Sequence, residues 1–355
     1  MDRLEEMIPY LLHWYRYNAR VLPWREDPSA YHVWISEIML QQTRVEAVRS
    51  YYQRFLTELP DIRSLAECPD DRLMKLWEGL GYYSRCRNLK KAAQLVCEQY
   101  GGELPADYKK LRELPGIGDY TAGAVSSIAF GLPEPAVDGN LLRVCARLTG
   151  SREDILSPAV KKNLTERLRA VMPEKESGAL NQALMDLGAG ICLPNGTPHC
   201  EDCPLMHLCV AFSEGVVSEI PVRAAKKERR TEKRTVFLLF REGRVLLHKR
   251  PEKGLLAGLY EFPNVSGALT AKAAKEALKV LLPMLSLTDG KLKKEEDAVH
   301  IFTHIKWEMK AYRGTVSADD AALPEGYIWA DENAFEAECS VPSAFGKWDV
   351  FSKKG

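Results

Sequence analysis

The hydrophobic periodicity of the chain changes after about residue 213, and this change constrains the fold more than any other feature. Before it, apolar residues recur at three- and four-residue spacing between prolines and glycines, as in amphipathic helices, over residues 33–48, 72–83, 89–100, 120–130, 140–148 and 160–172. Residues 235–240 and 244–250 instead form short apolar runs around a turn, which indicate strands. The sequence therefore predicts a multi-domain protein with an all-α first domain and an α+β second domain.

A polar, basic stretch separates the two patterns. Residues 221–234 carry seven Lys and Arg against two Asp and Glu and show no periodicity. This composition is typical of an interdomain linker, with a nuclear-localisation run as the less favoured alternative. We predict domains over residues 1–215 and 235–355, joined by a basic linker over 216–234. A chain of 355 residues is long enough for each domain to bury its own core.

The charge of the chain does not indicate a partner. Residues 1–220 carry 25 basic and 30 acidic side chains, and the whole chain has a net charge of +0. Binding to DNA would therefore depend on the local arrangement of a few groups. No apolar run approaches the roughly 20 residues of a membrane span, and the N-terminus has no secretory signal. We expect a cytoplasmic monomer without a membrane partner, whose nine cysteines are free thiols or metal ligands.

The segment LRELPGIGDYTAGAVSSIAF, residues 111–130, predicts two helices joined by a tight turn. Gly116 and Gly118 follow a proline and allow backbone conformations that other residues avoid. The second helix would begin with free N–H groups and a partial positive charge, which suit a phosphate. A plain connection between two packed helices is the alternative.

Four cysteines fall within 18 residues with the spacing C-x7-C-x2-C-x5-C. Such a group suits a metal centre, either iron–sulfur or zinc. Zinc sites more often pair two C-x2-C units across a longer gap, and this segment has one such unit. The candidate ligands are Cys192, Cys200, Cys203 and Cys209.

The hairpin sequence, LPGIG followed by YTAGAV, resembles that of the endonuclease III and MutY superfamily of DNA glycosylases. In the bifunctional members a lysine two residues after the last hairpin glycine attacks the sugar, and this chain has Tyr120 there. The resemblance therefore implies a monofunctional enzyme of the adenine-specific MutY type, which breaks the glycosidic bond without efficiently nicking the strand.

Two carboxylates match the catalytic pair of this family. Glu37, in WISEIMLQQTRV, holds the place of the glutamate that protonates the base, and Asp138, in PAVDGN, that of the catalytic aspartate. Asn140 matches the neighbour that hydrogen-bonds the aspartate. By pattern alone, Glu37 is a boundary residue of a helix over 33–48 and Asp138 is a helix N-cap. Burial would raise the pKa of Glu37, while helix N–H groups would hold Asp138 ionised.

The resemblance also assigns residues that meet DNA and the cofactor. It implies that GLGYYSRCRN, residues 79–88, forms a wedge loop with Leu80 and Tyr82, that Gln42 fills the gap left by the flipped base, and that Arg25 lines the adenine pocket. For the adjacent tyrosines, helix packing is the alternative. The superfamily carries a [4Fe-4S] cluster with the spacing x6, x2, x5, so the four cysteines are its expected ligands. This chain has one extra residue in the loop 193–199.

The second domain resembles a Nudix fold, most clearly over KRPEKGLLAGLYEFPNV, residues 249–265. It lacks the REXXEE helix that binds Mg²⁺ in Nudix hydrolases, so the resemblance implies recognition of an oxidised purine. HIFTHIKW, residues 300–307, matches an FSH segment that recognises 8-oxoguanine, with Thr303 in place of the serine and His304 as the histidine.

We therefore predict base excision repair of double-stranded DNA, by release of adenine opposite 8-oxoguanine or guanine. Three alternatives stay open at this point. The chain could be a related glycosylase acting on thymine or oxidised pyrimidines, a non-catalytic sensor of DNA damage, or a Nudix hydrolase. Tyr120 and the second domain argue against the first alternative, the matching pair of Glu37 and Asp138 against the second, and the missing glutamate box against the third.

Overall fold

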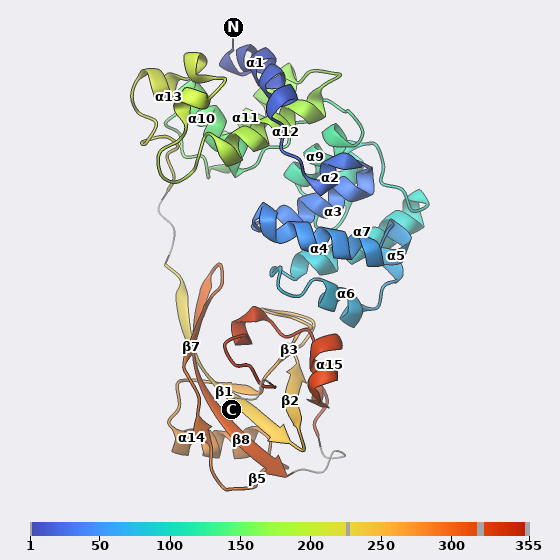
Figure 1. The fold of residues 1–355 in the computed structure, drawn as a ribbon, viewed down its shortest axis with the longest axis vertical. Coiled ribbons are helices and arrows are strands. Elements are labelled where there is room, and N and C mark those ends of the chain that lie inside the picture. The colour runs from blue at the N-terminus through green and yellow to red at the C-terminus, as the bar shows by residue number, and fades with distance from the viewer. Residues whose placement is uncertain (1, 225–227, 318–322, 352–355) are drawn as a thin grey trace. The chain divides into compact units, whose positions relative to one another are not determined.

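The computed structural model describes residues 2–224, 228–317 and 323–351. They form two compact units, Met1–Glu67 with Arg87–Ala225, and Cys68–Cys86 with Lys226–Gly355. The first is helical and the second is built on a sheet, so the predicted fold class is confirmed (Figure 1). Within the described ranges, no helix has the length and apolar character needed to cross a membrane.

The first unit is a bundle of short helices. Its core contains apolar side chains of α1, α10 and α12, which follow the expected three- and four-residue spacing, including Leu4, Met7, Leu11, Leu141, Leu148, Leu180 and Leu187. The helices are α1 (Arg3–Asn18), α2 (Pro23–Glu26), α3 (Ala30–Leu40), α4 (Val45–Glu58), α5 (Ile62–Glu67), α7 (Ser84–Tyr100), α8 (Tyr108–Glu113), α9 (Asp119–Ile128), α10 (Gly139–Thr149), α11 (Pro158–Val171), α12 (Ser177–Gly190) and α13 (Val210–Ser213).

The predicted continuous helix over 33–48 was wrong. Helix α3 ends at Leu40 and α4 begins at Val45, with Gln42 between them in a left-handed conformation at φ 59°. The intervening sequence, QQTR, has no apolar side chain to bury, which allows the chain to turn there. Glu37 remains on α3, but Val45 and Val48 belong to the next helix.

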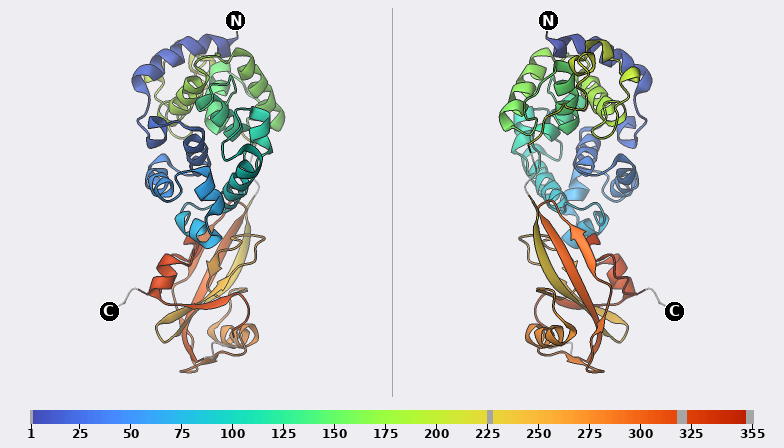
Figure 2. Two further views of the ribbon diagram at one scale, coloured as in Figure 1. Left: turned by 90° about the vertical axis from the view of Figure 1, so that its right-hand side faces the viewer. Right: turned by 90° about the vertical axis from the view of Figure 1, so that its left-hand side faces the viewer.

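The second unit is a twisted sheet with helix α14 against one face and the C-terminal segment against the other (Figure 2). The long strands β1 and β8 run parallel, with Arg230 opposite Ile305 and Phe240 opposite Thr315. Alternate residues of β1 point to opposite faces: Phe237 and Leu239 pack with α14, while Val236 and Leu238 pack with the C-terminal residues. The elements are β1 (Arg230–Arg241), β2 (Arg244–Lys249), β3 (Tyr260–Glu261), β4 (Asn264–Ser266), α14 (Ala271–Leu281), β5 (Ser286–Leu287), β6 (Lys293–Lys294), β7 (Ala298–Ile301), β8 (Ile305–Ser317), β9 (Tyr327–Ala330) and α15 (Glu332–Ala337).

The structure moves the start of the second domain into the predicted linker. Strand β1 begins at Arg230, so residues 230–234 pair with other strands and do not form a tether. The guanidinium of Arg234 lies 4.3 Å from the ring centre of Trp307 and donates to the side chain of Asn264 at 2.8 Å. At least one basic side chain of this segment, that of Arg234, therefore packs against the sheet.

The segment Cys68–Cys86, which we predicted within the first domain, belongs to the second unit. It contains α6 (Asp70–Leu76), whose Lys75 donates to the carbonyls of Phe335 at 3.3 Å and Cys339 at 3.2 Å. Beyond α6, the carboxylate of Glu78 accepts from the backbone N–H of Val341 at 2.8 Å. Periodicity does not report such contacts, because their partners are distant in sequence.

Candidate active site and cysteine cluster

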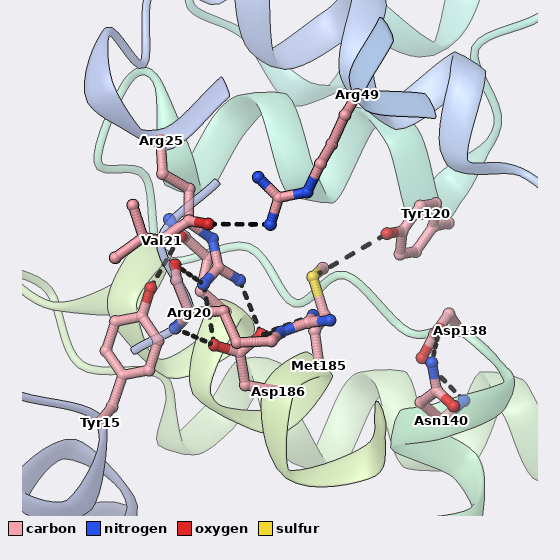
Figure 3. Close-up of polar contacts among 11 residues, drawn as sticks. Tyr15, Arg20, Val21, Arg25, Arg49, Tyr120, Asp138, Asn140, Met185 and Asp186 are labelled. Carbon is pink, nitrogen blue, oxygen red and sulfur yellow. Dashed lines mark hydrogen bonds and ion pairs between the residues drawn. The ribbon is translucent and has the colours of Figure 1, made fainter. Parts of the chain in front are cut away.

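A cavity of about 180 Å³ lies within the first unit. It brings together five predicted site residues from helices that are far apart in the sequence. Figure 3 shows four of them, with Arg25 on one side and Tyr120, Asp138 and Asn140 on the other. The five residues are Arg25, Glu37, Tyr120, Asp138 and Asn140.

The environment of Glu37 favours its uncharged form. Its side chain is buried on α3, and the hydroxyl of Tyr120 donates to Oε2 at 2.5 Å. Burial raises the pKa of Glu37 to about 7, and the charge of Asp138 adds to that rise, while the Tyr120 hydrogen bond and Arg25 oppose it. The expectation that burial raises this pKa is confirmed, and near pH 7 about half of the Glu37 carboxyl groups carry a proton.

Asp138 is the N-cap of α10. Its Oδ1 accepts from the backbone N–H groups of Asn140 at 2.9 Å and Leu141 at 2.8 Å, and the Asn140 side chain donates to Oδ2 at 3.0 Å. We expected these donors to govern its ionisation. Burial outweighs them, however, and raises the pKa of Asp138 above its ordinary value, although the hydrogen bonds and Arg143 oppose the rise.

Asn140 links this carboxylate to the region of the cysteines. Its Oδ1 accepts from Arg143 at 3.0 Å, and the same guanidinium donates to the carbonyls of Gly188 at 2.7 Å and Cys192 at 2.9 Å. Arg143 is buried, so these bonds compensate for its removal from water. The carboxylate and the first cysteine are therefore held in one hydrogen-bonded frame.

The four predicted ligands line one cavity together with Arg147. Nη1 of Arg147 lies 3.2 Å from Sγ of Cys192, and burial raises the pKa of Cys203 to about 12, so a cation is needed to keep that thiolate. In the described part of the chain, no three His, Cys, Asp or Glu residues lie as close as a single metal ion requires. A zinc ion would draw four sulfurs to about 2.3 Å from one point. The four thiols share one cavity, which fits a metal centre held by all four.

Helix α12 contributes pocket residues that the sequence reasoning missed. Gln182, Met185 and Ala189 follow a helical spacing of three and four residues, so one face of α12 lines the cavity. The hydroxyl of Tyr15 donates to Oε1 of Gln182 at 2.8 Å. Behind this face, buried Asp186 pairs with Arg25, with Nη1–Oδ2 2.8 Å and Nη2–Oδ1 2.9 Å. An aspartate within the mainly small and apolar segment SGALNQALMDLGAG was the available signal.

The glycine turn forms between α8 and α9 as predicted. Gly116 has φ 79°, and a Cβ atom there would lie 2.8 Å from Cβ of Asn88, so both conformation and space require glycine. Arg112 and Asp119 join the two helices by an ion pair of 2.6 Å. Gly118 is the N-cap of α9 and, because glycine has no side chain, it provides no side-chain cap for the first N–H groups of the helix. These groups are therefore suited to an anion.

The predicted DNA-contacting residues differ in their exposure. Gln42 is exposed, and Tyr82 is 44% exposed with φ 48°, a strained conformation for a tyrosine. Leu80 is 6% exposed, so it is an interior residue of this loop, and its contact with DNA stays a prediction. Burial of the Leu80 side chain removes apolar surface from water. Tyr82 has a polar hydroxyl, so its exposure to water costs less free energy.

The predicted lesion-reading residues lie in the turn between β7 and β8. Thr303 and His304 are both exposed there. Within the second unit, Oγ1 of Thr303 lies 3.4 Å from the hydroxyl of Tyr82. Thr303 and Tyr82, which were predicted from separate motifs, are therefore neighbours.

Known proteins match both units of the chain. Residues 35–170 match the family described as HhH-GPD superfamily base excision DNA repair protein, and residues 235–348 match the NUDIX domain. A solved thermostable thymine-DNA glycosylase resembles the chain with a TM-score of 0.54 and 29% identity, over 60% of this chain and 97% of that one.

Curated relatives match over both units. Adenine DNA glycosylase of Mus musculus is 34% identical, over 95% of this chain and 76% of its own. Adenine DNA glycosylase of Buchnera aphidicola subsp. Schizaphis graminum is 33% identical, over 83% of each chain. By this similarity across both units, the chain belongs to the adenine DNA glycosylase family of helix-hairpin-helix base excision DNA repair proteins.

Proposed function

We propose that this protein is a monofunctional DNA glycosylase that releases adenine mispaired with 8-oxoguanine or guanine in double-stranded DNA. The observation that carries the proposal is the cavity shared by Glu37, Asp138 and Tyr120. It combines an acid that is protonated near neutrality, a second carboxylate in a different environment, and a phenol where a lyase would have an amine.

The reaction needs both carboxylates. As the glycosidic bond breaks, its electron pair leaves with adenine, so a proton must reach the base and positive charge develops on the sugar. Glu37 supplies the proton, a contribution of typically 10²–10⁴ in rate. Asp138 stabilises the oxocarbenium-like sugar, and Asn140 orients its carboxylate. A water then adds to the sugar carbon and gives up its proton, which completes hydrolysis.

Tyr120 keeps the reaction monofunctional. Cleavage of the strand by a lyase begins with a Schiff base, which only an amine can form. Burial and the neighbouring carboxylates raise the pKa of Tyr120 well above its ordinary value, so the phenol stays neutral and donates to Glu37. Its role is to hold the acid.

DNA is bound through local features, in keeping with the neutral charge of the chain. The free N–H groups after Gly118 take a backbone phosphate, and Gly116 permits the turn that presents them. The target base must leave the duplex to reach the buried cavity. Gln42, which is exposed and in a left-handed conformation, fills the space that the base leaves. Tyr82, which is exposed in its own left-handed turn, belongs to the wedge loop.

Thr303 and His304 read the base opposite adenine from the exposed turn of the second unit. Hydrolysis of a nucleotide by this unit is not favoured. Helix α14 carries one acidic residue, Glu276, and that residue pairs with Lys279 at 3.0 Å. Such a helix lacks the row of carboxylates that binds Mg²⁺.

A [4Fe-4S] cluster is the cofactor that the cysteine cavity fits. Its ligands would be Cys192, Cys200, Cys203 and Cys209, and the cluster, when bound, holds the loop between α12 and α13 and supplies no step of hydrolysis. Arg143 and Arg147 position the first ligand.

The test uses enzyme in excess over duplexes that carry one adenine opposite 8-oxoguanine, opposite guanine or opposite thymine. We expect an alkali-labile site at the first two adenines and little at the third. A fourth duplex, with thymine opposite guanine, tests the activity named for the solved structural relative. Glu37→Gln should abolish release, while Glu46→Gln, at an exposed position on α4, should not. Release of thymine but not adenine would reject the proposal.

A further inference from the structure

Asp186 is a buried carboxylate that does not line the cavity but binds two residues that do. Its side chain is 2% exposed, and it lies on α12 behind Arg20 and Arg25, whose side chains line the cavity (Figure 3). The reaction proposed above does not use it. A buried charge without a function would be costly, so its contacts need an account.

The polar contacts of Asp186 join it to Arg20 and Arg25, and the Nη2 atom of Arg20 lies 2.6 Å from Oδ1 of Asp186. Both its oxygens accept from the Arg25 guanidinium, at 2.8 and 2.9 Å, in a bidentate pair. Arg20 donates to it from Nε at 2.7 Å and from its backbone N–H at 3.1 Å. Arg25 also donates to the carbonyl of Arg20 at 3.1 Å and lies 5.7 Å over the ring of Tyr15. A planar guanidinium held at both ends has one orientation.

The position of Arg25 matters because it is the cation that faces Glu37. The groups acting on Glu37 are Tyr120 of α9, Asp138 at the start of α10, and Arg25 of α2. A guanidinium without its own counter-ion would stabilise the ionised form of Glu37, which cannot donate a proton. Asp186 places one negative charge beside both Arg25 and Arg20, so the positive charge that Arg25 presents to Glu37 is reduced.

We propose that Asp186 is a positioning residue, which orients Arg25 toward the flipped base and offsets part of its charge, so that Glu37 stays protonated as the general acid. The inference rests on the proposed function for its consequence in catalysis. The effect of Asp186 on the protonation of Glu37 in the free protein is independent of the proposed function, because it involves no substrate.

The test separates this role from a purely structural one by its dependence on pH. In Asp186→Asn, the carbonyl oxygen still accepts hydrogen bonds but the charge is lost. We expect the midpoint of the fall in single-turnover rate at high pH to move down by about one unit, with roughly tenfold slower adenine release at pH 8, about twofold slower release at pH 6 and little change near pH 5. Asp186→Glu, which restores the charge, should return the midpoint toward that of the wild type.

The change should act through Arg25. In an Arg25→Met background, which lacks the guanidinium, Asp186→Asn should cause no further movement of the midpoint. The control is Glu219→Gln, which removes a carboxylate from the exposed pair with Arg152 at 2.9 Å and should leave the profile unchanged. An equal loss of rate at every pH in Asp186→Asn would overturn the proposal in favour of a structural role.

Two measurements keep the inference testable if a variant or the activity fails. A carbon-13 titration of the Glu37 carboxyl group, assigned with Glu37→Gln, follows the same midpoint without any substrate. If Asp186→Asn does not fold, Arg25→Met alone should move the midpoint upward, since it removes the only guanidinium among the groups acting on Glu37. An unchanged Glu37 titration in the folded variants would refute the inference even where adenine release is normal.

Discussion

Tyr120 donates a hydrogen bond to Glu37 at 2.5 Å, joining two residues that are 83 positions apart in the sequence. Tyr120 is the second residue of α9, the helix that the glycine turn orients, and Glu37 is on α3. The turn that presents N–H groups to DNA therefore begins the same helix that holds the proposed general acid. A change in the angle of α9 would therefore alter both the position of these N–H groups and the hydrogen bond to Glu37.

Removing the Tyr120 hydroxyl should extend activity to higher pH. Its hydrogen bond lowers the pKa of Glu37, which burial raises to about 7, so Tyr120→Phe should raise that pKa further. For the wild type we expect adenine release to be constant below about pH 7 and to fall tenfold per unit above it. Single-turnover rates between pH 5.5 and pH 9 should show a later fall in the variant. An earlier fall would contradict the hydrogen-bond geometry.

Glu37→Gln should stabilise the protein while abolishing catalysis. The pKa of Glu37 is about 7 when folded and 4.5 in its ordinary state, so above pH 4.5 ionisation favours the unfolded chain. The wild type therefore loses stability between about pH 4.5 and pH 7, and glutamine does not. The gain should be absent near pH 4 and on the order of 3 kcal/mol above pH 7. Urea unfolding at both pH values, with Glu46→Gln as the exposed control, measures it.

The two roles of Asp138 can be separated by two substitutions. Asp138→Asn keeps an acceptor for the N–H groups of Asn140 and Leu141 but removes the charge, so we expect near-normal stability and a loss of adenine release of about 10² or more. Asp138→Ala also removes the cap and should cost about 1 kcal/mol in addition. Equal stability of the two variants would argue against the cap, and normal turnover by Asp138→Asn against its role in catalysis.

Replacing a cysteine of the cavity should remove iron, whereas replacing another should not. Cys203→Ser deletes one of the four cavity thiols, and we expect loss of visible absorbance, loss of bound iron and a less stable region over residues 192–209. Cys97→Ser, on α7 and outside the cavity, is the matched control. Iron and zinc analysis decides the metal: stoichiometric zinc without iron in the wild type would exclude the cluster.

Gly116→Ala should damage the hairpin more than a comparable change elsewhere. Its φ of 79° disfavours a side chain, at about 1–2 kcal/mol, and the new Cβ would also lie 2.8 Å from that of Asn88. Gly131→Ala is the control, because φ is 68° but no atom lies within 4 Å of the added group. Thermal unfolding should show the larger loss for Gly116→Ala, with weaker binding to undamaged duplex. Equal losses of stability in the two variants would mean that Asn88 can move away from the added methyl group without a cost in free energy.

Local patterns allowed much of the fold to be predicted. Helices α7, α9, α10 and α11 lie where the three- and four-residue spacing indicated, and β1 and β2 where short apolar runs flank a turn. The break between α3 and α4 and the contacts of residues 68–86 with the second unit were missed. Both depend on what the chain packs against, which periodicity within one segment does not contain.

By itself the sequence determined what depends on residue type and short spacing: the helical and sheet units, the glycine turn, the cap at Asp138 and the run of four cysteines. Its resemblance to known glycosylases nominated Glu37 and Arg25. Only the tertiary structure decided which groups surround them, because ionisation and orientation depend on burial and on partners distant in the chain. Folding buries Glu37 beside Tyr120 and places Asp186 behind Arg25, and no local sequence pattern predicts either contact.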